Sequence, residues 1–210
     1  MAVPRIPKSR NDLLTEMAPD VERLYNRHLE APRLWFPHEQ IDWGQGENFA
    51  DLICYVSFQE RATQIAHRNT GAHLPKSDKI GRNVLALVAG DETKHYLFYR
   101  DLALAAFAID PSTMMIAAAK QVSAFAMPGT GIPNFTRHAV RIAREGIYGL
   151  GQFLRDVLDP VLGLWDVGHL EGLSAEAERA RQDLAVFVEK VSQSVERMAQ
   201  KAAGVTPALS

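Results

Sequence analysis

Apolar residues recur every three or four positions along most of the chain, which is the spacing of one face of an amphipathic helix. The pattern predicts helices over residues 11–29, about 51–70, about 77–109, 110–126, 134–157 and about 174–201. No segment shows the strict alternation of apolar and polar residues that indicates a half-buried β-strand. The sequence therefore predicts an all-α protein.

Capping and helix-breaking residues set most of these boundaries. Four residues precede apolar runs of helical spacing and can cap helices: Ser77, Asp110, Asn134 and Ser174. Gly71 is expected to end the second predicted helix in a left-handed conformation, and Pro160 is expected to disturb the helical region around it. Six apolar residues are expected on the core-facing side of the third helix: Ile80, Val84, Leu87, Val88, Leu97 and Leu102.

Length and composition favour one globular domain over residues 1–210, because the 47% of apolar residues supply one sizeable core. The net charge of −2 is spread along the chain and offers no basic stripe for nucleic acid. No apolar run approaches the ~20 residues that cross a bilayer. The single cysteine, Cys54, cannot form an internal disulfide, and no apolar signal segment follows the N-terminus. We therefore expect a cytoplasmic protein without a membrane span.

The segment Asp91-Glu92-Thr93-Lys94-His95 is the first candidate for chemistry. Glu92 and His95 stand three residues apart, one helical turn from each other, on a face that continues through Val88 and Tyr99. Burial of a carboxylate and an imidazole in an apolar stripe is costly without a partner. The pair could bind one metal ion, or its side chains could pair with each other or with water.

Glu60 lies in the middle of the preceding predicted helix and could be a ligand that faces this pair. Carboxylates and one imidazole suit iron or manganese better than a structural zinc site, which would recruit thiolates, and iron is the first choice. His67 shares the face of Glu60 but is interpreted as a satisfied core or surface histidine, without a role.

Two further groups of residues have both a structural and a functional interpretation. Met114, Met115, Phe125 and Phe153 could line a tunnel for an acyl chain or could belong to the ordinary core. Arg137, Arg141 and Arg144 could face an acidic carrier protein or could form a solvated helix face.

The run from Tyr55 to Thr63, which reads YVSFQERAT, together with His67 and the DETKH segment, resembles the soluble acyl-carrier-protein desaturases, in particular their bacterial branch. The resemblance implies a ferritin-like helical bundle with a di-iron centre. It implies that Glu60, Glu92 and His95 are iron ligands and that Thr63 assists oxygen activation. It also implies that Asp91 supports the histidine of the opposite ligand pair.

The chain lacks part of the ligand pattern of that family. The family places another ligand Glu and another Glu-Glu-x-x-His segment between its first helix and the helix with the SFQE sequence. Here residues 49–51 run almost directly into that helix, as after an internal deletion, and no second Glu-x-x-His occurs. We therefore expect an incomplete bundle with about half of the iron ligands.

Missing helices would leave apolar surface on the helices of the half-site, and three things could cover it. A homodimer or a partner desaturase subunit could pack there, or the connection with Trp35, Phe36 and Trp43 could fold over it.

Two main functional hypotheses follow from the resemblance. By the first, the protein is an oxidoreductase that introduces a double bond into a fatty acyl chain on acyl carrier protein, with iron, dioxygen and ferredoxin-type electrons. By the second, it is a catalytically impaired, shortened relative that binds the carrier protein or a desaturase subunit. A third possibility is a truncated product without a stable fold of its own.

Overall fold

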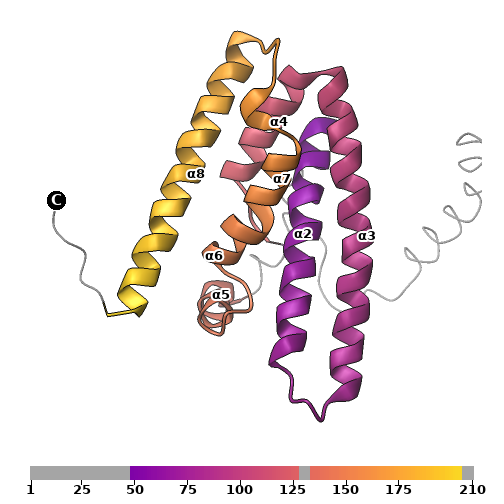
Figure 1. Cartoon of the computed structure of the whole chain (residues 1–210), viewed down its shortest axis with the longest axis vertical. Helices are drawn as coiled ribbons and strands as arrows, with labels where there is room; N and C mark the ends of the chain where they lie inside the picture. The colour runs from indigo at the N-terminus through magenta and orange to yellow at the C-terminus, as the bar shows by residue number, and fades with distance from the viewer. Residues whose placement is uncertain (1–47, 128–132, 205–210) are drawn as a thin grey trace, which may run out of the picture. The chain divides into compact units, whose positions relative to one another are not determined.

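The computed structural model of the chain describes residues 48–127 and 133–204, all of which belong to one compact unit, residues 42–210. The described residues form helices and no strand, which confirms the all-α class for this part of the chain (Figure 1). The elements are α2 (Phe49–His73), α3 (Lys79–Ile109), α4 (Pro111–Ser123), α5 (Phe135–Arg144), α6 (Leu150–Gln152), the π-helix η2 (Phe153–Leu158), α7 (Asp159–Leu164), the 3₁₀-helix η3 (Val167–His169) and α8 (Ala175–Ala202). The helix predicted over residues 11–29 lies outside the described residues.

Helices α2 and α3 form a long antiparallel hairpin (Figure 1). The prediction that Gly71 ends α2 is wrong, because the helix continues to His73 and stops before Leu74, which precedes Pro75 and is extended. A Cβ atom at Gly71 would lie 3.3 Å from the Leu85 Cβ, so the glycine lets α3 approach closely. The cap of α3 is Asp78, not Ser77: its carboxylate accepts a hydrogen bond from the Gly81 N–H at 2.8 Å.

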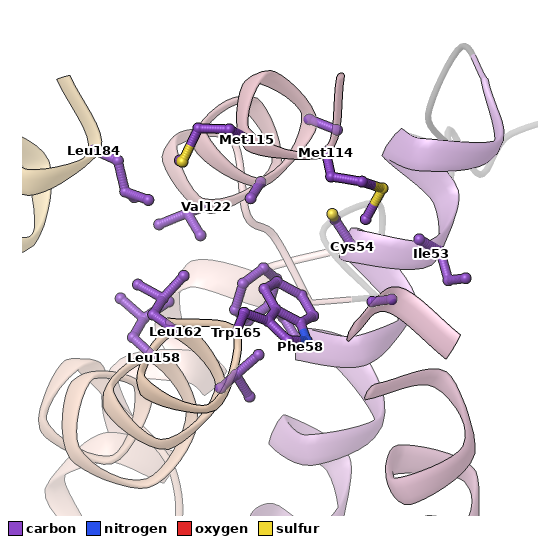
Figure 2. Packing of buried hydrophobic residues seen from close by; sticks show 14 of the residues in the cluster. Ile53, Cys54, Phe58, Met114, Met115, Val122, Leu158, Leu162, Trp165 and Leu184 are labelled. Carbon is purple, nitrogen blue, oxygen red and sulfur yellow. The ribbon is translucent and has the colours of Figure 1, made fainter. Parts of the chain in front are cut away.

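The core lies where α4, η2, α7 and α8 pack beside the hairpin (Figure 2). Trp165 is buried at its centre, with its indole N–H donating to the Arg100 carbonyl at 3.2 Å and its ring edge-to-face with Phe58. Met114 and Met115 are buried in this cluster. The candidate tunnel residues Phe125 and Phe153 stack on each other there, with ring centroids 4.9 Å apart. These four residues have the contacts of core side chains.

The predicted helix over residues 134–157 is divided. Its first part, α5, ends at Arg144, and Gly146 adopts a φ of 70° before helical structure resumes at Leu150. The prediction that Asn134 caps this helix is wrong, because Asn134 is in a left-handed conformation and its side chain accepts no capping hydrogen bond. Pro160 follows the π-helical turn η2 and has no N–H to offer the carbonyl four residues earlier, at Asp156. The Arg61 Nε of α2 donates to that carbonyl at 2.8 Å instead.

Two other predicted helices have nearly the expected bounds. Asp110 caps α4 through the Thr113 N–H, although α4 ends at Ser123 rather than near 126. Ser174 caps α8 through the Ala177 N–H, as expected. Helix α8 buries Leu184 and Val191 against the core.

The prediction of which side of α3 faces the core is wrong. Helix α3 contacts α2 and α4 through Ala89, Tyr96, Ala103 and Phe107, which are its buried residues. Of the predicted residues, Val88 and Leu102 are half-buried, whereas the other four are exposed: Ile80, Val84, Leu87 and Leu97. The helix has more than one apolar face, and the tertiary contacts bury only the one with small and aromatic side chains. None of the described helices is long and apolar enough to cross a membrane.

Candidate metal centre

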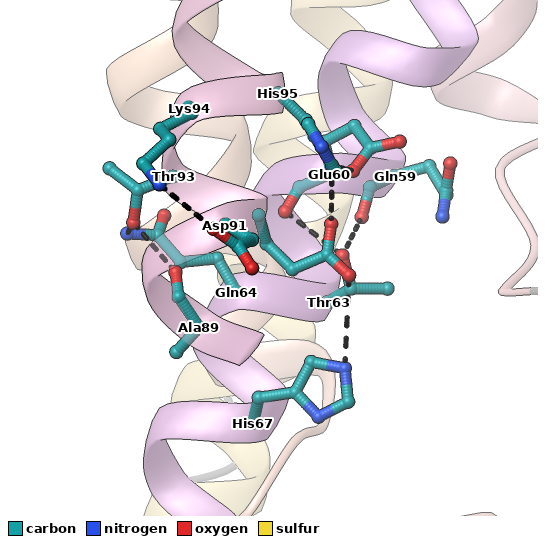
Figure 3. Close-up of polar contacts among 11 residues, drawn as sticks. Gln59, Glu60, Thr63, Gln64, His67, Ala89, Asp91, Thr93, Lys94 and His95 are labelled. Atoms are coloured by element: carbon teal, nitrogen blue, oxygen red, sulfur yellow. Dashed lines mark hydrogen bonds and ion pairs between the residues drawn. The ribbon is translucent and has the colours of Figure 1, made fainter. Parts of the chain in front are cut away.

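A chain of hydrogen bonds between α2 and α3 holds the middle of the hairpin in register (Figure 3). The Arg61 guanidinium donates to the Gln64 side-chain oxygen at 2.6 Å, and the Gln64 amide donates to the Thr93 hydroxyl at 2.6 Å. Thr93 in turn donates to the Ala89 carbonyl at 2.7 Å. These bonds are adjacent to Glu92 on α3 and therefore position its carboxylate relative to α2.

The structure brings Glu60, Glu92 and His95 together, as the sequence predicted for a metal site (Figure 3). His95 Nδ1 lies 3.2 Å from Glu92 Oε2 and 3.4 Å from Glu60 Oε2. One donor atom from each of the three side chains lies within 4.8 Å of the other two. A single ion could therefore contact all three residues after small side-chain adjustments.

The two carboxylates crowd each other. The Glu60 and Glu92 side chains are 15% and 20% exposed, while that of His95 is more than half exposed. Burial, followed by hydrogen bonding and charge repulsion from Glu92, raises the pKa of Glu60 to about 7, and His95 opposes the shift. At neutral pH without a cation, the Glu60 carboxyl is therefore protonated for part of the time.

This arrangement fits a divalent metal ion. A cation in place of the Glu60 proton would offset the repulsion between the carboxylates, and oxygen ligands with one imidazole suit iron or manganese. A complete four-helix site for two irons uses a single Glu on each of two helices and a Glu-x-x-His pair on each of the other two. The described residues supply one of each kind.

His67 belongs to the surroundings of this site, which the sequence analysis did not recognise. Its Nε2 lies 4.0 Å from Glu92 Oε1, whereas His95 Nδ1 lies 3.2 Å from the other carboxylate oxygen, Glu92 Oε2. His67 follows Glu60 by seven residues and so lies two helical turns along the same face of α2. That spacing was the available signal, but only the pairing of α2 with α3 puts Glu92 beside it.

The two other predicted site residues have contacts within their own helices. The Thr63 hydroxyl donates to the backbone carbonyls of Gln59 and Glu60, at 3.1 and 3.0 Å. Asp91 is exposed and pairs with Lys94 at 2.9 Å, and this hydrogen bond lowers the pKa of the Asp91 carboxyl. The second histidine that Asp91 would support has no counterpart in the part of the chain that the structure describes.

A groove of about 590 Å³ continues from His67 towards the turn of the hairpin. Gln64 and Thr93 line it at the end near Glu92, and Arg68 and Arg82 line it farther along. Arg82 donates to the carbonyls of Gly71 and Leu74, so it closes the C-terminal end of α2. Between these polar and basic side chains, the groove is lined by small residues, among them Ala72, Ala86 and Gly90.

Comparison with known proteins decides the family. Residues 10–209 match the sequence profile of a fatty acid desaturase family. DesA1 of Mycobacterium tuberculosis, a protein assigned to the acyl-carrier-protein desaturases, is 35% identical over 181 residues, which are 85% of this chain. The chain belongs to the acyl-carrier-protein desaturase type of this family. The chloroplast stearoyl-acyl-carrier-protein 9-desaturase of Gossypium hirsutum is 32% identical over 161 residues, or 73% of this chain.

A solved structure supports the ferritin-like fold of this desaturase-family chain. The DesA2 protein of M. tuberculosis, whose structure is described as that of an acyl-carrier-protein desaturase homologue, superposes with a TM-score of 0.53 at 16% identity. The superposition covers 80% of this chain and 98% of the DesA2 chain. At this identity the likeness bears on the fold alone.

The chain spans only about half of the length of its curated relatives. The matched part is 53% of M. tuberculosis DesA1 and 40% of the cotton enzyme. The activities of those whole proteins are therefore proposals for this chain.

Proposed function

We propose that this desaturase-family protein takes part in the desaturation of an acyl chain carried by acyl carrier protein, with iron bound through Glu60, Glu92 and His95. The observation that supports the proposal is the convergence of these three side chains within 4.8 Å on α2 and α3. The names of DesA1 and the cotton enzyme supply the substrate class, an acyl group on acyl carrier protein.

The protein residues have distinct roles in this proposal. Bound iron would supply the oxidising chemistry, with dioxygen and electrons from a ferredoxin-type donor. Glu60 loses its proton on binding, so that Glu60 and Glu92 both bind as carboxylates, and His95 binds through a neutral imidazole nitrogen. The Thr63 hydroxyl, one turn from Glu60, is proposed to assist oxygen activation by moving a proton, for which it would leave its bonds to the backbone carbonyls.

The expected partners are the carrier protein, the electron donor and a second chain that completes the ligand set. Arg137, Arg141 and Arg144 lie exposed on α5 at a spacing that puts them on one face, and they are the candidate surface for an acidic carrier protein. A single domain with a deletion near residues 49–51 and a cytoplasmic location stay predictions from the sequence.

The alternative function is that of a shortened relative that binds the carrier protein or a desaturase subunit without catalysis. The observation that favours it is the half-set of ligands: oxidation at an iron pair needs ligands for both ions, and the described residues provide one group of three.

Iron binding and product formation would separate the two functions. The parent and the Glu60→Ala and His95→Ala variants are each loaded anaerobically with ferrous iron. The controls are His73→Ala and Glu171→Ala, at exposed positions away from the centre. The desaturase proposal predicts that the parent and the controls bind iron and that both site variants lose it. It also predicts that the iron-loaded parent, supplied with a ferredoxin system, introduces a double bond into an acyl chain on acyl carrier protein. Iron binding without product, together with capture of the carrier protein, would favour the alternative. If both site variants bind as much iron as the parent, the assignment of Glu60 and His95 as ligands is wrong.

A further inference from the structure

The α2–α3 hairpin exposes apolar side chains on the side of its metal ligands. This open face consists of Phe49 and Leu52 on α2 and Val84, Leu87 and Phe98 on α3. On α2, Phe49 and Leu52 precede Glu60 by eleven and eight residues. On α3, Val84 and Leu87 precede His95 by eleven and eight residues, and Phe98 follows it by three. These spacings are close to whole helical turns, so each residue is near the ligand side of its helix. Val84 and Phe98 are 53% and 62% exposed. On α3, the exposed Asp91 and Lys94 lie between Leu87 and Phe98. Exposed apolar side chains on either side of the ligands along a helix are typical of an interface.

The ligands on the open face are one half of a two-fold arrangement. A complete two-ion site in a four-helix bundle contains each ligand type twice, with a single Glu on two helices and Glu-x-x-His on the other two. The hairpin presents Glu60 on α2 and Glu92 with His95 on α3. A second hairpin with the same sequence, related by a two-fold axis, would supply the remaining half.

The rest of this chain cannot supply the same half. Glu92 and His95 form the only Glu-x-x-His in the whole sequence. Within residues 48–127 and 133–204, no second group of three potential ligands comes together. A second copy of this chain carries such a pair and is therefore the partner that the sequence itself offers.

Charge makes such pairing depend on metal. Each open face has two closely spaced carboxylates, those of Glu60 and Glu92. Two faces in contact would bring four carboxylates together, which repel one another when ionised. Two divalent cations between the faces would balance these four negative charges. Association and metal binding should therefore be coupled.

We propose that two copies of this chain pair through their open faces around a two-fold axis and together hold two divalent metal ions, with Glu60, Glu92 and His95 of each copy as ligands. The inference rests on the ligand assignment of the proposed function. It adds that the site is built between chains, with one ion per chain rather than two.

Mass and metal content, measured on the same samples, test the proposal. The full chain is freed of metal with a chelator and titrated anaerobically with ferrous iron, and separately with Co²⁺, whose absorption spectrum reports ligand geometry. Light scattering after size exclusion gives the mass, and elemental analysis gives the bound metal. The expected result is a monomer without metal that becomes a dimer as binding approaches one ion per chain. A monomer at saturation, or a dimer that forms equally well without metal, would overturn the proposal.

Charge introduced into the open face provides a second test. Val84→Glu and Phe98→Glu should abolish the metal-dependent dimer and weaken metal binding by at least tenfold, although neither residue is a ligand. Leu97→Glu and Leu104→Glu are matched controls, because these exposed residues lie on the opposite side of α3 from His95. The controls should dimerise as the parent does. Circular dichroism and thermal unfolding establish that all four variants are folded.

The possible results separate this inference from the proposed function. If monomers bind iron through Glu60 and His95, or bind two ions per chain, the pairing of copies is wrong but the desaturase ligand assignment stands. If a dimer forms and the Val84→Glu and Phe98→Glu variants retain it, the copies do not use the open face. If metal binding is absent, or is unchanged when Glu60 and His95 are replaced, both proposals fail.

Discussion

Glu60 shows how the folded environment changes the acidity of a single residue. Burial and the nearby Glu92 carboxylate raise its pKa from 4.5 to about 7. A raised pKa favours the protonated group in the folded state, so this stabilising contribution is complete below about pH 4.5 and is lost as the pH rises through about 7. Above that pH, the metal-free protein must hold two repelling carboxylates.

The Glu60→Gln variant tests this effect. In the presence of a chelator, the variant should be more stable than the parent at pH 8 by about 1 kcal/mol, a value reduced to allow for solvent near the site, and equal to it near pH 5. Urea unfolding at both pH values measures the difference. Glu171→Gln, at an exposed position, should change little at either pH. A Glu60→Gln effect that is independent of pH would contradict the assigned cause.

His67 permits a second prediction at the scale of one residue. Its imidazole lies 4.0 Å from Glu92 Oε1 and can orient that carboxylate directly or through water. Loss of a group that orients a metal ligand costs about tenfold in affinity. His67→Gln should therefore weaken Co²⁺ binding by about tenfold, whereas His73→Gln, at the exposed end of the same helix, should not. Competition with a chelating dye measures both, and equal affinities would exclude a role for His67.

Between elements, Arg61 joins α2 to the irregular helix that contains Pro160. Its guanidinium donates to the Asp156 carbonyl and to Gln64, and it lies over the Tyr96 ring at 5.2 Å. The Asp156 bond exists because Pro160 cannot provide the usual helical N–H. One arginine therefore supports both the π-helical turn and the hydrogen bonds that position Thr93.

A double-mutant cycle tests this connection. Arg61→Met should destabilise the protein by about 2 kcal/mol, because the Asp156 carbonyl and the Gln64 side chain each lose a donor. In a Pro160→Ala background, the new N–H can approach the Asp156 carbonyl, and the cost of Arg61→Met should fall by about 1 kcal/mol. Chemical denaturation of the four proteins gives the coupling. Additive effects would show that the Asp156 bond contributes little.

At the scale of the whole molecule, the proposed recognition of a carrier protein would depend on the exposed positive charge of α5. Replacement of Arg137, Arg141 and Arg144 together by Glu should weaken binding of an acidic acyl carrier protein by more than tenfold at low salt. The control replaces Arg179, Lys190 and Lys201 of α8 by Glu, with the same change of net charge. Fluorescence anisotropy with a labelled carrier protein measures the affinities. Equal losses in both triple variants would indicate a general charge effect rather than a docking surface.

The sequence by itself determined the helical class, most helix positions and the pairing of Glu92 with His95. These features are local. Side-chain caps such as Asp110 and Ser174 act within one helical turn, and residues three apart share a helix face wherever the helix packs. The family also followed from local sequence, because the segments around Glu60 and His95 carry the resemblance.

Only the tertiary structure decided which face of α3 is buried, how close Glu60 and Glu92 lie, and which residues stand beside them. Periodicity finds an apolar face but cannot choose between two of them, and α3 buries Ala89 and Tyr96 while Val84 and Leu87 stay exposed. The raised pKa of Glu60 and the position of His67 both depend on the packing of α2 against α3. Such effects depend on through-space distances between residues far apart in the chain, which local sequence patterns do not contain.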